Sequence, residues 1–136
     1  MKLTEIITAG AKATRTVEVT REMTVAHFHD YMPEVFGTPM MIYHMEVTAS
    51  DAIQQHLPEG WISVGVVVAV RHLAATPIGM KVTFEAEVVS VDDNTVTFKV
   101  EAFDEAEKIG EGSHVRAPVH LDRFMKRVKD KSSRES

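Results

Sequence analysis

Strict alternation of apolar and polar residues marks the second half of the chain. Residues 80–88 and 95–103 alternate in this way, and the turn sequence Asp-Asp-Asn at 92–94 lies between them. A period of two is that of a strand with one buried face, so the pattern predicts an antiparallel hairpin. A last strand is predicted over residues 109–121, with its aliphatic side chains on one face and its histidines and Arg116 on the other.

An apolar segment over residues 38–57 has the period of a helix. Thr38 is a suitable N-cap, and a proline follows it at the first helical position, where a missing N–H costs nothing. Pro58 and Gly60 predict the end of the helix. Apolar residues lie on two of its sides, so we expect it to be mostly buried. On its remaining side lies His44, which is therefore expected to be peripheral.

Two further strands are predicted, a short one around residues 16–20 and a long, valine-rich one over residues 61–74 that is buried on one face. The order is then strand, buried helix and four long antiparallel strands, which is an α+β arrangement. An antiparallel curved sheet wrapped around a central helix satisfies this order, and that is the hot-dog fold. Small sheets of this kind commonly pair edge to edge, so a homodimer is the expected assembly.

The composition is that of one globular domain. The chain has 136 residues, of which 44% are hydrophobic and 26% charged. We expect a single domain over residues 1–125, followed by a polar, frayed tail over residues 126–136. The chain has no cysteine, which excludes disulfides, zinc–thiolate sites and a catalytic thiol. The histidines have no spacing specific to a metal site, so no metal is expected.

Charge and hydropathy narrow the range of partners. The net charge of -5 disfavours general binding to nucleic acid, although a local basic rim for one nucleotide-bearing ligand remains compatible with it. No uncharged segment approaches the ~20 apolar residues that span a bilayer, and the N-terminus lacks the apolar core of a signal peptide. We therefore expect a cytoplasmic protein that does not cross a membrane. Arg71 and Arg116 are expected to be solvated rim charges.

Two polar residues interrupt apolar patterns and are the candidates for chemistry. Glu46 lies within an apolar stripe of the predicted helix, and His72 follows five aliphatic residues of the same parity in the long strand. Each has an ordinary structural explanation, since a glutamate can reach solvent and a histidine can be satisfied in a core. If the helix packs on that face of the sheet, however, a carboxylate and an imidazole face the same interior, which is the pairing of general acid–base catalysis.

Two smaller features lie next to these candidates. Thr38 is on the same side of the helix as Glu46, but the eight intervening steps at ~1.5 Å each separate them by about 12 Å, so a joint role needs a substrate or a histidine between them. Gly65 interrupts the valine-rich strand. It indicates either a bulge or a place where a carbonyl ligand approaches backbone N–H groups.

Four segments together resemble a known family. They are PEVFGT (33–38), HME (44–46), VGVVVAVRHLAATPIG (64–79) and IGEGSHVRAPVHLDRF (109–124), and in this order they resemble the hot-dog thioesterases typified by the fluoroacetyl-CoA-specific thioesterase. The resemblance covers roughly residues 17–127. It implies hydrolysis of a short acyl-CoA by a homodimer without metal or redox cofactor. It also implies a catalytic set of Thr38, Glu46 and His72, with a backbone contact to the thioester from Gly65.

The residues themselves leave other functions open. The leading hypothesis is a short-chain acyl-CoA thioesterase in which Val25 and Phe28 contact the substrate. A hot-dog enoyl-CoA hydratase or dehydratase also uses a histidine and an acid beside a thioester. In a binding module without catalysis, Glu46 and His72 would only satisfy each other, and Val25 and Phe28 would be pocket walls.

Overall fold

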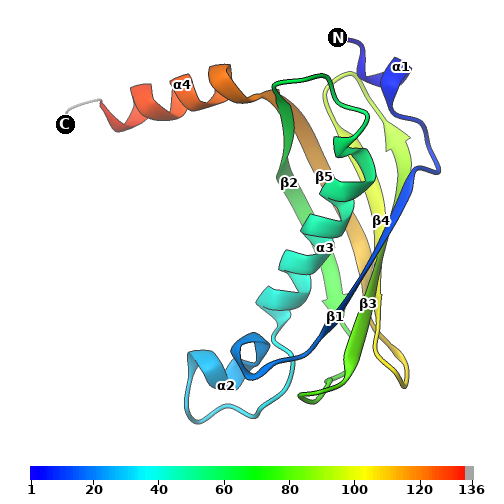
Figure 1. Cartoon of the computed structure of the whole chain (residues 1–136), viewed down its shortest axis with the longest axis vertical. Helices are drawn as coiled ribbons and strands as arrows, with labels where there is room; N and C mark the ends of the chain where they lie inside the picture. Colours follow the sequence, from blue (N-terminus) through cyan, green and yellow to red (C-terminus); the bar gives the residue numbers. More distant parts are fainter. Residues whose placement is uncertain (134–136) are drawn as a thin grey trace.

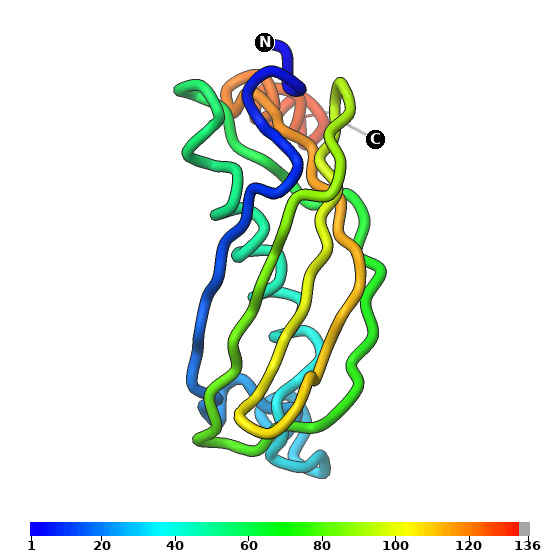
Figure 2. The backbone as a smooth tube through the Cα atoms, turned by 90° about the vertical axis from the view of Figure 1, so that its right-hand side faces the viewer, coloured from blue at the N-terminus to red at the C-terminus, as the bar shows by residue number. Residues whose placement is uncertain are grey.

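The computed structural model describes residues 1–133 and shows one curved antiparallel sheet around a helix (Figures 1 and 2). The sheet has five strands in the order β1-β3-β4-β5-β2. Their bounds are β1 (Lys12–Glu18), β2 (Trp61–His72), β3 (Lys81–Val91), β4 (Val96–Phe103) and β5 (Lys108–His120). The helix against the concave face is α3 (Thr38–Gln54). The predicted α+β hot-dog arrangement is thus confirmed.

The core lies between α3 and the central strands. The predicted alternation of β3 and β4 is confirmed, with Val82, Phe84, Val96 and Phe98 all 0% exposed. The buried side of α3 is narrower than the sequence predicts. It is formed by the buried residues Met41, His44, Met45, Thr48, Ala49, Ala52 and Ile53. Glu46 is only half-buried, because its side of the helix is turned toward the open edge of the sheet rather than toward the core.

The start of α3 differs from the prediction by one residue. Gly37 is the N-cap, so Thr38 and Pro39 occupy the first turn of the helix. A threonine at the N-cap would use its hydroxyl to accept a backbone N–H of the first turn. Since Thr38 is not the cap, its hydroxyl is free to contact another element.

Four short helical elements complete the chain. They are α1 (Leu3–Ile6), η1 (Arg21–Met23), α2 (Val25–Phe28) and α4 (Leu121–Ser132). Helix α4 leaves the end of β5 and projects away from the sheet (Figure 1), so the predicted frayed tail is helical as far as Ser132 and only residues 134–136 lie outside the described part. Among the described residues, no helix is both long and apolar enough to cross a membrane.

Strand β2 lies at an edge of the sheet, and this corrects the expectation of a buried face. Val66, Val67 and Val68 are 55%, 45% and 41% exposed. The register with β5 also shifts between Gly65 and Val67, which leaves Val66 as the extra residue of a β-bulge. The bulge reverses the alternation of β2. Odd-numbered residues face the helix before the bulge, and even-numbered residues face it after the bulge.

Candidate active site

The first of two polar clusters joins the start of α3 to the end of β2. Thr38 Oγ1 and His72 Nδ1 are hydrogen bonded at 2.7 Å. The two side chains line a hollow of about 400 Å³ together with Val25 from α2 and residues of the segments 32–36 and 73–75. The contact depends on Gly37 being the cap, because the hydroxyl of Thr38 is thereby directed to the imidazole.

The environment of His72 favours the neutral imidazole. Burial lowers the pKa of His72 from its usual 6.5, and the backbone of Ala74 opposes that shift. Its Nε2 atom is buried and has no hydrogen-bond partner among the described residues. A neutral imidazole that is fixed through one nitrogen and unpartnered at the other is suited to proton transfer.

The second cluster surrounds Glu46 in the middle of α3. Arg116 Nη1 lies 3.4 Å from Glu46 Oε2. The same guanidinium donates from Nε to Ser63 Oγ and from Nη2 to the Ser63 carbonyl oxygen, both at 2.8 Å. The Arg116 side chain is 9% exposed and that of Glu46 37%, so the carboxylate is held from within the protein and remains open on its outer side.

His114 completes this cluster and its tautomer follows from its partners. Arg116 Nη1 donates to His114 Nε2 at 3.1 Å, and a guanidinium has no lone pair to accept with. The proton of the neutral ring is therefore on Nδ1, which donates to the Val67 carbonyl oxygen at 2.7 Å. Burial is the main cause that lowers the pKa of His114, consistent with a neutral ring beside Arg116.

Gly65 lies directly against the Glu46 carboxylate. A Cβ at this position would collide with Glu46 Oε2, so the glycine is required for close approach rather than for its backbone angles. The β-bulge that follows Gly65 turns both this residue and His72 toward α3, although one number is odd and the other even. A bulge was one of the two explanations that the sequence pattern offered for Gly65, and the register shift directly after this residue confirms it.

Within one chain the predicted residues form two groups. Thr38 and His72 are in contact, and so are Glu46 and Gly65, but Glu46 and His72 do not form an ion pair. Eight steps of helix keep Thr38 and Glu46 about 12 Å apart. Phe28 is 53% exposed on α2 and is not among the residues that line the hollow beside His72.

Sequence reasoning missed how deeply polar residues are buried. Arg116, expected to be a rim charge, is 7% exposed, and His114 is 1% exposed. A usable signal was their shared parity on one face of β5, the face that meets Glu46. His44, expected to be peripheral, is 5% exposed and its ring lies 5.3 Å from that of Phe84. Among the described residues, no group of three His, Cys, Asp or Glu side chains is placed to hold a metal ion.

The chain is similar to known proteins in both sequence and fold. The sequence matches the family described as fluoroacetyl-CoA-specific thioesterase over residues 19–122. The fluoroacetyl-CoA thioesterase of Streptantibioticus cattleyicolor is 36% identical over 129 residues, which cover 90% of this chain and 93% of that protein.

Solved structures give the same result. A structure of the fluoroacetyl-CoA thioesterase superposes with a TM-score of 0.88 at 35% identity, covering 92% of this chain and 97% of that one. A hot-dog-like protein from Thermanaerovibrio acidaminovorans also has a TM-score of 0.88, at 28% identity, covering 96% and 97%. Family match, sequence identity and fold agree, and the chain therefore belongs to the fluoroacetyl-CoA-specific thioesterase family of hot-dog acyl-CoA hydrolases.

Proposed function

We propose that this thioesterase hydrolyses short-chain acyl-CoA as a homodimer, with each active site assembled from both copies. The observation that carries the proposal is that β2 is an edge strand with three exposed valines. It pairs with β5 on one side only, and it contributes residues to both polar clusters. An exposed apolar edge strand of this length is a template for pairing with a second strand. The protein works without a cofactor, and the cytoplasm suits a chain that has no cysteine.

Antiparallel pairing of two β2 strands brings the separated clusters together. We place the two-fold axis between Val68 and Ala69. Gly65 of one copy then lies opposite His72 of its partner, because each residue is three and a half positions from the axis. Residues opposite each other in an antiparallel pair have Cα atoms about 5 Å apart. Glu46 of one copy then faces the partner's His72, whereas within one chain they are kept apart by the length of α3.

Each residue has a role in this composite site. The Gly65 N–H stabilises the oxyanion that develops on the thioester carbonyl. Either the Glu46 carboxylate attacks the carbonyl carbon and forms an anhydride that water then hydrolyses, or water attacks the carbonyl carbon directly. In both routes the carbon–sulfur bond breaks as the tetrahedral intermediate collapses. Neutral His72 accepts a proton from the attacking water and passes it to the thiolate of CoA, and Thr38 holds the imidazole through Nδ1. The products are a carboxylic acid and free CoA.

A short acyl group is the proposed substrate class. The hollow beside His72 is about 400 Å³ and is bounded by Val25 and the partly exposed segment that follows α2. Structures of similar thioesterase variants were solved in complex with fluoroacetate and CoA, and with acetyl-CoA. Phe28 is exposed on α2 and is not part of the lining, so its proposed contact with the substrate is outside this hollow.

Release of free thiol from a panel of acyl-CoA substrates tests the activity. Acetyl-, fluoroacetyl- and longer acyl-CoA are compared, and kcat is expected to fall by at least about 100-fold in His72→Ala and in Glu46→Gln. The exposed His56 provides a matched control, and His56→Ala is expected to behave as the unaltered protein. Unchanged thiol release in the two active-site variants would rule out the proposed chemistry. Hydration of enoyl-CoA without thiol release would instead indicate a hydratase.

Mixing the two inactive variants tests the composite site. A heterodimer of His72→Ala and Glu46→Gln contains one site with both substitutions and one site with neither. After subunit exchange, about one quarter of the unaltered activity is therefore expected to return, since about half of the dimers are mixed and each has one intact site. If each site belonged to a single chain, mixing would restore nothing.

A further inference from the structure

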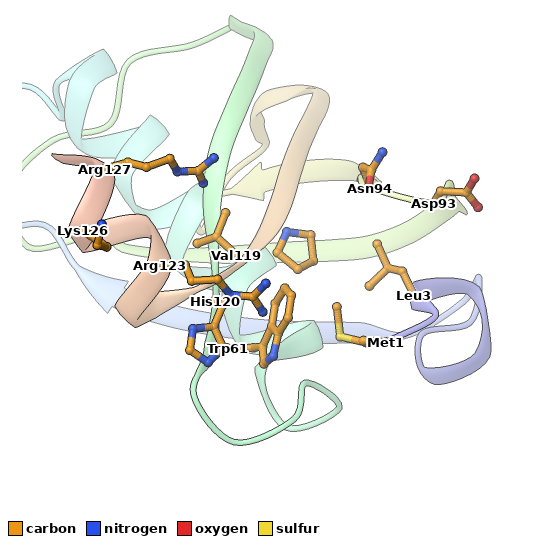
Figure 3. A pocket seen from close by; sticks show the side chains of 11 residues that line it. Met1, Leu3, Trp61, Asp93, Asn94, Val119, His120, Arg123, Lys126 and Arg127 are labelled. Atoms are coloured by element: carbon orange, nitrogen blue, oxygen red, sulfur yellow. The ribbon is translucent and has the colours of Figure 1, made fainter. Parts of the chain in front are cut away.

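A basic hollow lies at the end of the molecule where β2 begins and β5 ends. It encloses about 510 Å³ between the ends of these strands, the tip of the β3–β4 hairpin and helix α4 (Figure 3). Three cations on α4 line it, Arg123, Lys126 and Arg127. The indole of Trp61 and the imidazole of His120 also line it. None of these residues belongs to the two polar clusters of the active site.

The positive charge of this hollow is concentrated and largely unpaired. The chain as a whole has a net charge of -5, yet the lining contains three cations and a single carboxylate, that of Asp93. Among the described residues, no carboxylate lies within 4.0 Å of the Arg123 or Arg127 guanidinium, and Lys126 reaches Asp130 only at 3.8 Å in an exposed pair. Positions 123, 126 and 127 share one side of a helix, so the three charges converge. An anion with several charges fits such a site.

The hollow also offers a flat aromatic surface. The guanidinium carbon of Arg123 lies 5.6 Å from the centre of the Trp61 ring, and the His120 ring stands almost perpendicular to the indole at 5.7 Å. A tryptophan beside a guanidinium is a common stacking surface for a nucleobase. Phosphate-binding cations and a stacking surface in one hollow indicate a phosphorylated nucleotide.

The position of the hollow relates it to the active site. Before the bulge, every second residue of β2 points to the same face of the sheet. Ser63 and Gly65 both face the Glu46 cluster, so Trp61, two residues before Ser63, lies on that face as well. Trp61 and Gly65 are four residue steps apart along the strand, a distance of about 13 Å. An extended pantetheine arm covers a distance of this order. We propose that the hollow binds the phosphorylated adenosine end of CoA while the thioester lies at Gly65, an inference that rests on the proposed function.

Two charge-matched variants test the role of α4. Arg123→Gln/Arg127→Gln removes two charges from the hollow, and Lys129→Gln/Lys131→Gln removes two from the same helix outside its lining. For the first variant, KM for acyl-CoA is expected to rise by at least about tenfold, because charged hydrogen bonds to phosphate are lost. Its kinetics with the matching acyl-pantetheine, which lacks the nucleotide, are expected to be unchanged. The control variant should retain its KM for both substrates.

A direct binding measurement does not depend on hydrolysis. Trp61 is the single tryptophan of the chain, so its fluorescence reports on this hollow alone. Titration with adenosine 3′,5′-bisphosphate is expected to change the emission of the unaltered protein, with an affinity at least about tenfold weaker in Arg123→Gln/Arg127→Gln. Adenosine alone, which has no phosphate, should bind much more weakly.

The outcomes separate this inference from the proposed function. If the bisphosphate binds at Trp61 but no thioester is hydrolysed, the nucleotide site stands and the thioesterase assignment fails. If acyl-CoA is hydrolysed but its KM is the same in both variants, or the bisphosphate leaves the tryptophan emission unchanged, the nucleotide site is refuted and the activity stands.

Discussion

Replacing Arg116 with methionine should destabilise the protein strongly. The Arg116 side chain is 9% exposed, and its guanidinium makes two 2.8 Å hydrogen bonds to Ser63 and a 3.4 Å contact to Glu46. Methionine fills much of the same volume but supplies no donor. Each lost hydrogen bond removes about 1 kcal/mol, and the groups left behind without a partner bring the total to about 3–5 kcal/mol. The corresponding fall in Tm is about 10–20 °C.

A second arginine provides the control. Arg71 is paired with Glu111 at 2.7 Å, a shorter contact than that of Arg116 with Glu46, but its side chain is 74% exposed. Water screens this pair, so Arg71→Met should cost less than about 1 kcal/mol. The prediction is therefore that the longer ion pair matters more, because burial rather than distance determines the cost of breaking it.

Urea denaturation measures both effects, with all variants at one fixed protein concentration because the stability of an associating protein depends on its concentration. Arg116→Met/Glu46→Met should be less unstable than Arg116→Met alone, because the double variant leaves no carboxylate without a partner. Equal losses in Arg116→Met and Arg71→Met, or a loss below about 1 kcal/mol in the former, would show that the guanidinium does not hold the cluster together.

Three more predictions concern activity. Gly65→Ala should lower kcat by at least about tenfold while Tm changes little, because the new methyl group displaces the half-exposed Glu46 carboxylate. Full activity of this variant in a thiol-release assay would contradict the contact. Thr38→Val should lower kcat by about 10- to 100-fold, whereas Thr38→Ser should largely retain it, since the hydroxyl is the group that contacts His72. Equal kcat in the two variants would count against that hydrogen bond. Burial lowers the pKa of His72 below 6.5, and the neutral imidazole is the active form. The value of kcat/KM should therefore be constant above pH 7 and fall only as the pH drops below 6.5. A fall that begins above pH 7 would indicate a raised pKa and refute this expectation.

Local sequence patterns determined the elements and the unusual residues. Alternation of period two predicted the β3–β4 hairpin, and the proline and glycine after residue 57 predicted the end of α3 to within a few residues. Glu46 and His72 were identifiable because each interrupts an apolar pattern. These properties depend on residues that are neighbours in the sequence, so they can be recognised before the fold is known.

Only the tertiary structure decided which surfaces are covered. The valines of β2 are as apolar as those of β3, yet they are exposed because β2 is the edge of the sheet. The bulge after Gly65 reversed the alternation of β2, and the approach of α3 buried Arg116 beside Glu46. Strand order, register and helix docking depend on residues far apart in the chain. A local period cannot specify them, because the same alternation is compatible with either face being buried.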